Sequence, residues 1–318
     1  MFKSVRYSRM VNICSSIWLC SVINTKKQRY RKIPKSAYKV LDAPGMEDDY
    51  YLSLVTWSAN DVLGVALQSS LYLWDATSST VTQLLDLGGE EDAENRNIIT
   101  SLCWSTSGRH IAVADSLGKM QLWDVSEKKH VRSVSAHRLR IGALTWHGHL
   151  LASGSRDRSI KIMDVRSKEK EVIKICNHTQ EVCGLKWSCD GSFLASGGND
   201  NALKVWDPRA LHDSNGRSQP LHDWKEHAAA VKAVAWSPHQ HGILASGGGT
   251  ADKCIKTWNV MSGARLNSVN TGSQVCNIAW ASTVNEIIST HGFSKYHVAL
   301  WSYPSLRRLV TLQGHTSR

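Results

Sequence analysis

The sequence lacks the marks of several large protein classes. Its 318 residues include only 3 Phe and 6 Pro, and no run of 18 or more apolar residues occurs, so a transmembrane helix is not expected. The 8 Cys contain no Cys-x-x-Cys pair and no close Cys/His cluster. This pattern favours buried, reduced thiols of an intracellular protein over a disulfide scaffold or a zinc site. We expect no cofactor and no metal.

Acidic residues are missing from the first 41 positions, which hold 10 of the 38 Lys and Arg residues. The rest of the chain holds 28 basic and 27 acidic side chains, so the net charge of +11 comes almost wholly from the N-terminal segment. A basic body that wraps nucleic acid is therefore not the default interpretation. We expect residues 1–37 to form a basic, disordered segment. A secretory signal or organelle presequence at 11–23 is the alternative, but no Ala-x-Ala site follows.

Motifs for catalysis are also missing. The stretch Gly247–Lys253 is rich in Gly but lacks the Gly-Lys-Ser/Thr ending of a phosphate loop. No His-Glu-x-x-His sequence and no nucleophile elbow occur. We therefore expect a protein that is not an enzyme and that serves as a binding platform.

Tryptophan, by contrast, is abundant and regularly spaced. Eleven of the 13 Trp fall into two interleaved series with steps of 40 to 52 residues, and Met163 takes one place in the second series. The second series ends segments that alternate between apolar and polar residues, as in a half-buried strand. The two series are Trp57, Trp104, Trp146, Trp187, Trp236, Trp280 and Trp74, Trp123, Met163, Trp206, Trp258, Trp301.

A unit of about 40–45 residues that ends in Trp-Asp is the signature of a WD-repeat propeller blade. The sequence therefore predicts an all-β protein, a WD-repeat β-propeller over residues 38–318, with six complete blades plus the start of a seventh at Gly314–Arg318. The chain is expected to be truncated before the seventh blade.

Recurring polar residues predict a hydrogen-bond network inside a blade. In two units a His, a Ser and an Asp recur at similar spacing, and such a buried network is tolerable only when all its groups are satisfied. We interpret these residues as structural, and Met163 is expected to remove one donor from its unit. The predicted networks are His137, Ser153, Asp157 and His178, Ser196, Asp200, Trp206.

Several strings resemble the propeller of the Fizzy and Fizzy-related family, the co-activators of the anaphase-promoting complex. The resemblance runs from about residue 31 to 318 and goes beyond generic blade residues. The strings are Arg31–Pro34, Tyr38–Pro44, Asp48–Leu52, Gln180–Trp187, Ala195–Asn201, Ala230–Trp236, Ala245–Thr250 and Gly272–Cys276.

The resemblance implies a ubiquitin-ligase adaptor in cell-cycle control that captures short degrons, the Lys-Glu-Asn (KEN) box and the destruction box. Its implied partners are subunits of the anaphase-promoting complex/cyclosome and degron-bearing substrates such as cyclins. The implied protein is a monomeric adaptor of the nucleus and cytoplasm, with no nucleic-acid or membrane partner.

The family's KEN-box receptor matches six positions of this chain. A carboxylate would suit the Lys of the motif, a guanidinium its Glu, and amides its Asn and backbone. The alternative for the Asn-Asp-Asn stretch is a turn. The matching residues are Asp49, Asn199, Asn201, Thr250, Gln274 and Arg318.

The destruction-box groove of the family matches Leu41, as an apolar anchor, and Asp42, for the Arg of the motif. The alternative is that Tyr38–Leu41 supplies a strand that closes the ring, with Asp42 as a turn former. The other wall of this groove would come from a seventh blade. The family's Asp-Arg-Phe/Tyr-Ile-Pro box and its Ile-Arg dipeptide do not occur in this chain, which puts ligase docking in doubt.

Two alternatives from other classes remain. One is a WD-repeat scaffold or truncated decoy that has lost degron binding or ligase activation. The other is a nucleic-acid or anionic-membrane binder that acts through residues 1–41; the cluster Lys26–Lys32 is also consistent with nuclear import.

Overall fold

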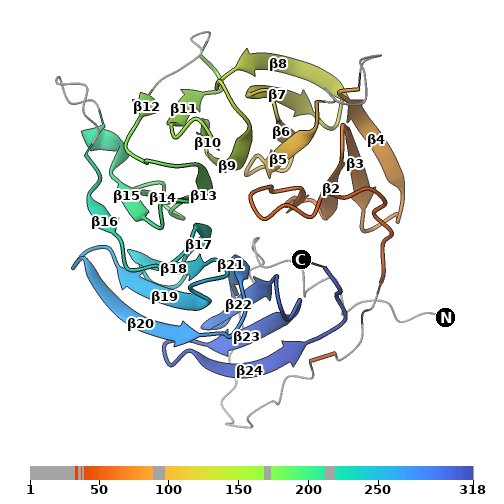
Figure 1. Ribbon diagram of the computed structural model, residues 1–318. Helices are drawn as coiled ribbons and strands as arrows, with labels where there is room; N and C mark the ends of the chain where they lie inside the picture. Colours follow the sequence, from red (N-terminus) through yellow and green to blue (C-terminus); the bar gives the residue numbers. More distant parts are fainter. Residues whose placement is uncertain are drawn as a thin grey trace, which may run out of the picture.

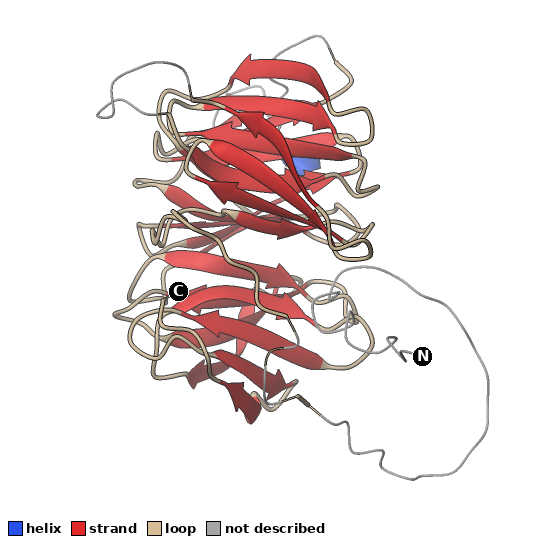
Figure 2. Cartoon of the chain, turned by 90° about the vertical axis from the view of Figure 1, so that its right-hand side faces the viewer, coloured by secondary structure: helices blue, strands red, loops and turns tan. Residues whose placement is uncertain are grey.

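The computed structural model describes residues 33–34, 37, 39–88, 97–167, 173–211 and 219–317. Nearly all regular structure in these residues is β-strand, and one short helical turn, η3 (Pro208–Ala210), follows β15 (Figure 2). No helix in the described residues is long and apolar enough to span a membrane. The predicted disordered segment lies almost entirely outside the described residues, and the boundary at residue 38 stays a prediction.

The strands form six four-stranded antiparallel sheets, each made from four strands consecutive in the chain. The sheets are arranged around a ring (Figure 1). The all-β propeller prediction and its six blades are thus confirmed. The strands of the first three sheets are β1 (Val55–Trp57), β2 (Val62–Leu67), β3 (Ser70–Asp75), β4 (Val81–Asp86); β5 (Ile99–Trp104), β6 (His110–Asp115), β7 (Lys119–Asp124), β8 (Lys129–Ser135); β9 (Ile141–His147), β10 (Leu150–Ser155), β11 (Ile160–Asp164), β12 (Ile173–Ile175).

The strands of the other three sheets are β13 (Val182–Trp187), β14 (Leu194–Gly198), β15 (Leu203–Trp206), β16 (His222–Trp224); β17 (Val231–Trp236), β18 (Ile243–Gly248), β19 (Cys254–Asn259), β20 (Ala264–Asn270); β21 (Val275–Trp280), β22 (Glu286–His291), β23 (Val298–Ser302), β24 (Arg307–Leu312). Within the described chain, no strand follows β24. The start of a seventh blade therefore stays a prediction.

The first strand of each sheet lies nearest the ring axis, and these strands pack in the order β5, β9, β13, β17, β21. Apolar clusters fill the space between successive sheets; one joins Ala152 of β10 to Leu185 and Trp187 of β13. Because alternate residues of a strand point to opposite faces, each of the four middle sheets contributes apolar side chains to two such clusters, and the first and last sheets contribute to one each. The core is thus a series of layers between blades.

The first sheet and the last sheet flank a sector of the ring that contains no strand among the described residues (Figure 1). On the first sheet the registers Leu63–Trp74 and Val65–Tyr72 place four apolar side chains on the face turned from the second sheet. These four are only partly buried. Lys39 lies on this face, with its ammonium 4.6 Å from the Trp74 ring centroid.

The predicted blade network is present in its full form in the fourth sheet. The Trp206 Nε1 donates to Ser196 Oγ at 2.9 Å, and Ser196 Oγ lies 2.8 Å from His178 Nε2. His178 Nδ1 lies 3.1 Å from both carboxylate oxygens of Asp200. Because Asp200 accepts from Nδ1, Nε2 is the acceptor for the Ser196 hydroxyl. The four side chains thus form a directed chain of hydrogen bonds, as predicted.

The third sheet keeps part of this network. His137 bonds Asp157 through Nδ1 at 3.0 Å and Ser153 through Nε2 at 2.9 Å, but Met163 offers no N–H. A cavity of about 180 Å³ remains beside Met163 and Ser153. The missing donor is therefore confirmed, and the smaller side chain also leaves space unfilled.

Candidate functional site

One end of the ring is built from equivalent positions in five sheets. The first residue of each inner strand pairs with the end of the second strand, as Val182 pairs with Gly198 and Val231 with Gly248. In each of these five sheets, the residue that directly precedes the first strand lies at this same end. These preceding residues are Ile98, Arg140, Glu181, Ala230 and Gln274.

Three charged side chains meet at this end. Arg140 donates from Nε to Glu181 Oε1 and from Nη2 to Glu181 Oε2, both at 2.9 Å, and from Nη1 to Asp49 Oδ2 at 2.8 Å. Burial alone would lower the pKa of Arg140, but the hydrogen bonds and charges of Glu181 and Asp49 raise it. Two carboxylates and one guanidinium leave the cluster with one net negative charge. Such a cluster can accept a further cation.

Asp49 joins this cluster because the segment 49–52 turns across the end of the ring. Its Oδ1 accepts the backbone N–H of Tyr51 at 2.8 Å, which closes a local turn. Each carboxylate oxygen has a second lone pair, and about a third of the side chain is exposed. Asp49 therefore keeps acceptor capacity for a ligand.

Tyr51 connects this charged cluster to an amide pair. Its hydroxyl donates to Asn199 Oδ1 at 2.8 Å, and its ring lies 5.4 Å from the Arg140 guanidinium carbon. Asn199 in turn donates from Nδ2 to Gln180 Oε1 at 2.7 Å. Asn199 is thus held in one orientation, with its side chain aimed along the same end of the ring.

Tyr50, the neighbour of Tyr51, is buried and reaches the other half of the ring. Its hydroxyl lies 3.3 Å from the carbonyl oxygens of both Ala230 and Val275. Burial is the largest cause that raises the pKa of Tyr50 well above its usual value. Lys232 donates to the Leu52 carbonyl at 2.6 Å. Residues 49–52 therefore contact the third, fourth, fifth and sixth sheets.

The predicted KEN-box residues are placed unequally. Asp49 and Asn199 are brought together through Tyr51 and Arg140. Gln274 is buried at 6% exposure, and its Oε1 lies 4.0 Å from Cys276 Sγ. Its amide is therefore directed inward, next to the Tyr50 cluster.

Two further predicted KEN-box residues, Asn201 and Thr250, lie in turns at this end of the ring. Thr250 is exposed in the β18–β19 turn, where Gly249 N–H donates to Ala230 O at 2.9 Å. Asn201 has a positive φ of 62° and occupies the turn after β14, so the turn alternative describes its backbone. Arg318 lies outside the described residues. The role of all six residues in ligand binding stays a prediction.

The predicted destruction-box residues lie in the segment that runs beside the first sheet. Leu41 is 41% exposed and Asp42 is exposed. They precede a turn in which the Met46 N–H donates to Ala43 O, and Gly45 there lies against Gln68 of the β2–β3 turn. Residues 39–46 form no strand, so a ring-closing strand at Lys39–Leu41 is not observed.

Sequence reasoning missed Arg140, Glu181 and Tyr51. The signal was present, because both Arg140 and Glu181 stand three residues after a network histidine, His137 and His178. That spacing puts each just before an inner strand, at the end where the loops converge. Gly142 provides a further sign, since a Cβ there would lie 2.9 Å from the Tyr51 carbonyl oxygen.

Neither metal chemistry nor a disulfide is built into the described residues. No group of three or more His, Cys, Asp or Glu side chains there is arranged to hold a metal ion. None of the six described cysteines forms a disulfide. Burial raises the pKa of Cys183, which lies beside Tyr50, to about 12, so this thiol is not a nucleophile.

Comparison with known proteins identifies relatives of the whole propeller. The family profile of the CDC20/Fizzy WD40 domain matches residues 41–318. Protein FIZZY-RELATED 2 of Arabidopsis thaliana is 52% identical over 288 residues, which are 91% of this chain and 57% of that protein. Anaphase-promoting complex subunit cdh1 of Dictyostelium discoideum is 42% identical over 93% of this chain and 42% of its own length.

A solved structure has the same fold. A chain in the crystal structure of the mitotic checkpoint complex superimposes with a TM-score of 0.83 and 39% sequence identity, over 94% of this chain and 91% of that one. This chain spans a little over half the length of the first curated relatives it matches. The expectation of a non-catalytic protein agrees with a family of WD40 adaptors. The chain belongs to the Fizzy/Fizzy-related family of WD40 proteins.

Proposed function

We propose that this chain is the substrate-binding propeller of an anaphase-promoting complex co-activator and that it binds KEN-box degrons at the end of the ring that carries Asp49 and Asn199. Family membership supports the ligase assignment, since one relative is itself named as an anaphase-promoting complex subunit. The observation that carries the binding assignment is the cluster in which Arg140 links Asp49 to Glu181 and Tyr51 links Arg140 to Asn199.

The chemistry of the cluster suits the motif. The net negative charge and the remaining lone pairs of Asp49 favour the ammonium of the motif's Lys. The amides of Asn199 and Asn201 and the hydroxyl of Thr250 can bond the peptide backbone and the motif's Asn. Arg318 is proposed as the partner of the motif's Glu. Gln274 is proposed as an inner support of this surface, since its side chain is buried.

Leu41 and Asp42 are proposed as one wall of a destruction-box site, because an exposed Leu beside a carboxylate suits an apolar residue next to an Arg. The proposed partners are ligase subunits and degron-bearing substrates such as cyclins, bound by a monomeric adaptor in the nucleus and cytoplasm. No nucleic-acid or membrane partner is proposed.

Fluorescence anisotropy of the purified chain with a labelled KEN peptide, next to the same peptide with three Ala, tests the proposal. Asn199→Ala should weaken KEN binding at least tenfold, and Thr250→Ala should weaken it less. Asn285→Ala is the matched control, because Asn285 is exposed in the β21–β22 turn at the opposite end of its sheet. Equal binding of both peptides by a folded sample would contradict the degron assignment and favour the scaffold alternative.

A further inference from the structure

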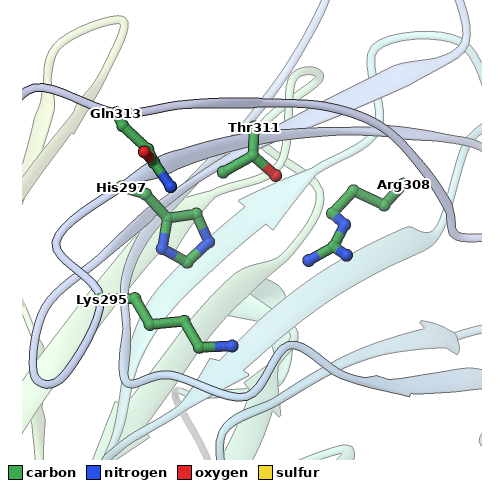
Figure 3. Close-up of a pocket in the computed structure, with 5 residues that line it drawn as sticks. All are labelled: Lys295, His297, Arg308, Thr311 and Gln313. Atoms are coloured by element: carbon green, nitrogen blue, oxygen red, sulfur yellow. The ribbon is translucent and has the colours of Figure 1, made fainter.

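The last sheet carries a pocket that the degron surface does not use. It has a volume of about 390 Å³ and is lined by Lys295, His297, Arg308, Thr311 and Gln313 (Figure 3). Lys295 and His297 lie between β22 and β23, while Arg308 and Thr311 belong to β24. The pocket is thus formed where the β22–β23 connection meets the outer strand.

The two charged lining residues, Lys295 and Arg308, are both cations. Figure 3 shows the Lys295 ammonium, the His297 ring and the Arg308 guanidinium directed toward a common space. None of the three makes a salt bridge to a carboxylate within the part of the chain that the structure describes. Two cations without an acid between them repel each other, so an anion between Lys295 and Arg308 would stabilise both.

His297 supplies a second, independent sign of a ligand. The residue is only 3% exposed, and its buried Nδ1 has no hydrogen-bond partner in the described residues. Figure 3 shows the other ring nitrogen, Nε2, on the side of Arg308, where it can donate to a bound acceptor. The residue lines the pocket, so a ligand there lies within reach of its ring.

Burial and the nearby positive charges both disfavour the protonated form of the His297 ring. Burial, followed by the positive charges of Lys295 and Arg308, lowers its pKa. His291 stacks on it with ring centroids 4.3 Å apart, and the pKa of His291 is itself lowered to about 4, mainly by burial. An anion bound beside Lys295 and Arg308 would cancel their effect and raise the pKa of His297.

We propose that this pocket is an anion site for a phosphate group, carried by a phosphorylated Ser or Thr side chain or present as free phosphate. Three oxygens of a phosphate can accept from Lys295, His297 and Arg308 at once, whereas a carboxylate offers two. The Thr311 hydroxyl and the Gln313 amide add neutral donors on the same side. The pocket exceeds the size of one phosphate ion, which leaves room for the group that carries it.

The test is a calorimetric titration of the whole chain with three probes: inorganic phosphate, a Gly-rich peptide with one phosphoserine, and the same peptide with Glu in that place. Lys295→Gln and Arg308→Gln should each weaken phosphate binding about tenfold. Both side chains are exposed, so neither variant should unfold the protein. Arg307→Gln is the matched control, because Arg307 is exposed on the same strand and its side chain points to the opposite face.

The outcomes separate the sources. Tighter binding of the phosphopeptide than of free phosphate identifies a peptide-borne group, and the reverse order identifies the free ion; both support the site. Equal binding of the Glu peptide and the phosphopeptide would overturn the phosphate assignment. If Arg307→Gln weakened phosphate binding as much as Arg308→Gln, the effect would come from general surface charge. This result would also overturn the phosphate assignment.

A second readout concerns His297 alone. Sulfate keeps its two charges from pH 5 to 8, so its affinity should rise as pH falls if binding raises the pKa of His297. The ring signals of His297 in an NMR titration should shift to a higher pKa in sulfate. Binding with no change in this titration would contradict a role for the ring.

Discussion

Arg140 binds both carboxylate oxygens of Glu181 through parallel hydrogen bonds of 2.9 Å, so the loop before β9 is tied to the loop before β13. The Glu181 side chain is 8% exposed. Removal of the guanidinium would therefore leave a buried carboxylate without its cation.

We expect Arg140→Ala to lower the free energy of unfolding by about 2–3 kcal/mol, measured by urea denaturation at pH 7. Arg166→Ala is the control. Arg166 makes a similar two-point contact with Asp164, at 3.1 and 2.9 Å, but is 67% exposed, so its loss should cost much less than the loss of Arg140. Equal losses in the two variants would contradict the importance of burial.

The two blade networks differ in the number of side chains that bond to their serine. Ser196→Ala would leave both the Trp206 N–H and His178 Nε2 buried without a partner, whereas Ser153→Ala leaves only His137 Nε2 so. We expect a loss of about 2–3 kcal/mol for Ser196→Ala and about 1–2 kcal/mol for Ser153→Ala. Thermal and urea unfolding of both variants measure the difference, and a larger loss at Ser153 would refute the argument.

The cavity beside Met163 predicts a stabilising substitution. Met163→Trp should fill space next to Met120 and Val134 and place an indole N–H near Ser153, with a gain of about 1 kcal/mol. Met163→Phe supplies bulk without the N–H and should gain less. A lower urea midpoint for Met163→Trp would show instead that the third sheet is too tightly packed for an indole.

The lowered pKa of His291 predicts acid sensitivity. The unfolded chain takes up this proton near pH 6.5 and the folded chain only near pH 4, so stability from this residue is present above pH 6.5 and is lost as pH falls toward 4. The loss by pH 5 should be about 2 kcal/mol.

His291→Gln removes the titration and keeps a polar partner for Ser289, which lies 2.7 Å from His291 Nε2. The difference in unfolding free energy between pH 7.5 and pH 5 should be smaller in this variant than in the unmodified chain. The same pH dependence of stability in the variant and in the unmodified chain would mean that protonation of His291 does not cause the loss.

Much of the fold could be predicted because the Trp series repeats with the blade. The position of each inner strand, the Ser196–Trp206 bond and the missing donor at Met163 all follow from local spacing. The contacts of Tyr50 and Tyr51 could not, because their partners come from loops more than 140 residues away in sequence. The role of Arg140 was missed for the same reason, because its contact with Asp49 joins residues 91 positions apart in the sequence.

The turn of residues 49–52 across the end of the ring has a consequence for the order of events during synthesis. Tyr50 is made early, but its last partner, the carbonyl of Val275, is 225 residues further along. At a translation rate of roughly 5–20 residues per second, Tyr50 is synthesised about 11–45 s before Val275. The early sheets must therefore assemble around residues 49–52 before these residues can make all their native contacts. This end of the molecule can be completed only after the last sheet has been synthesised.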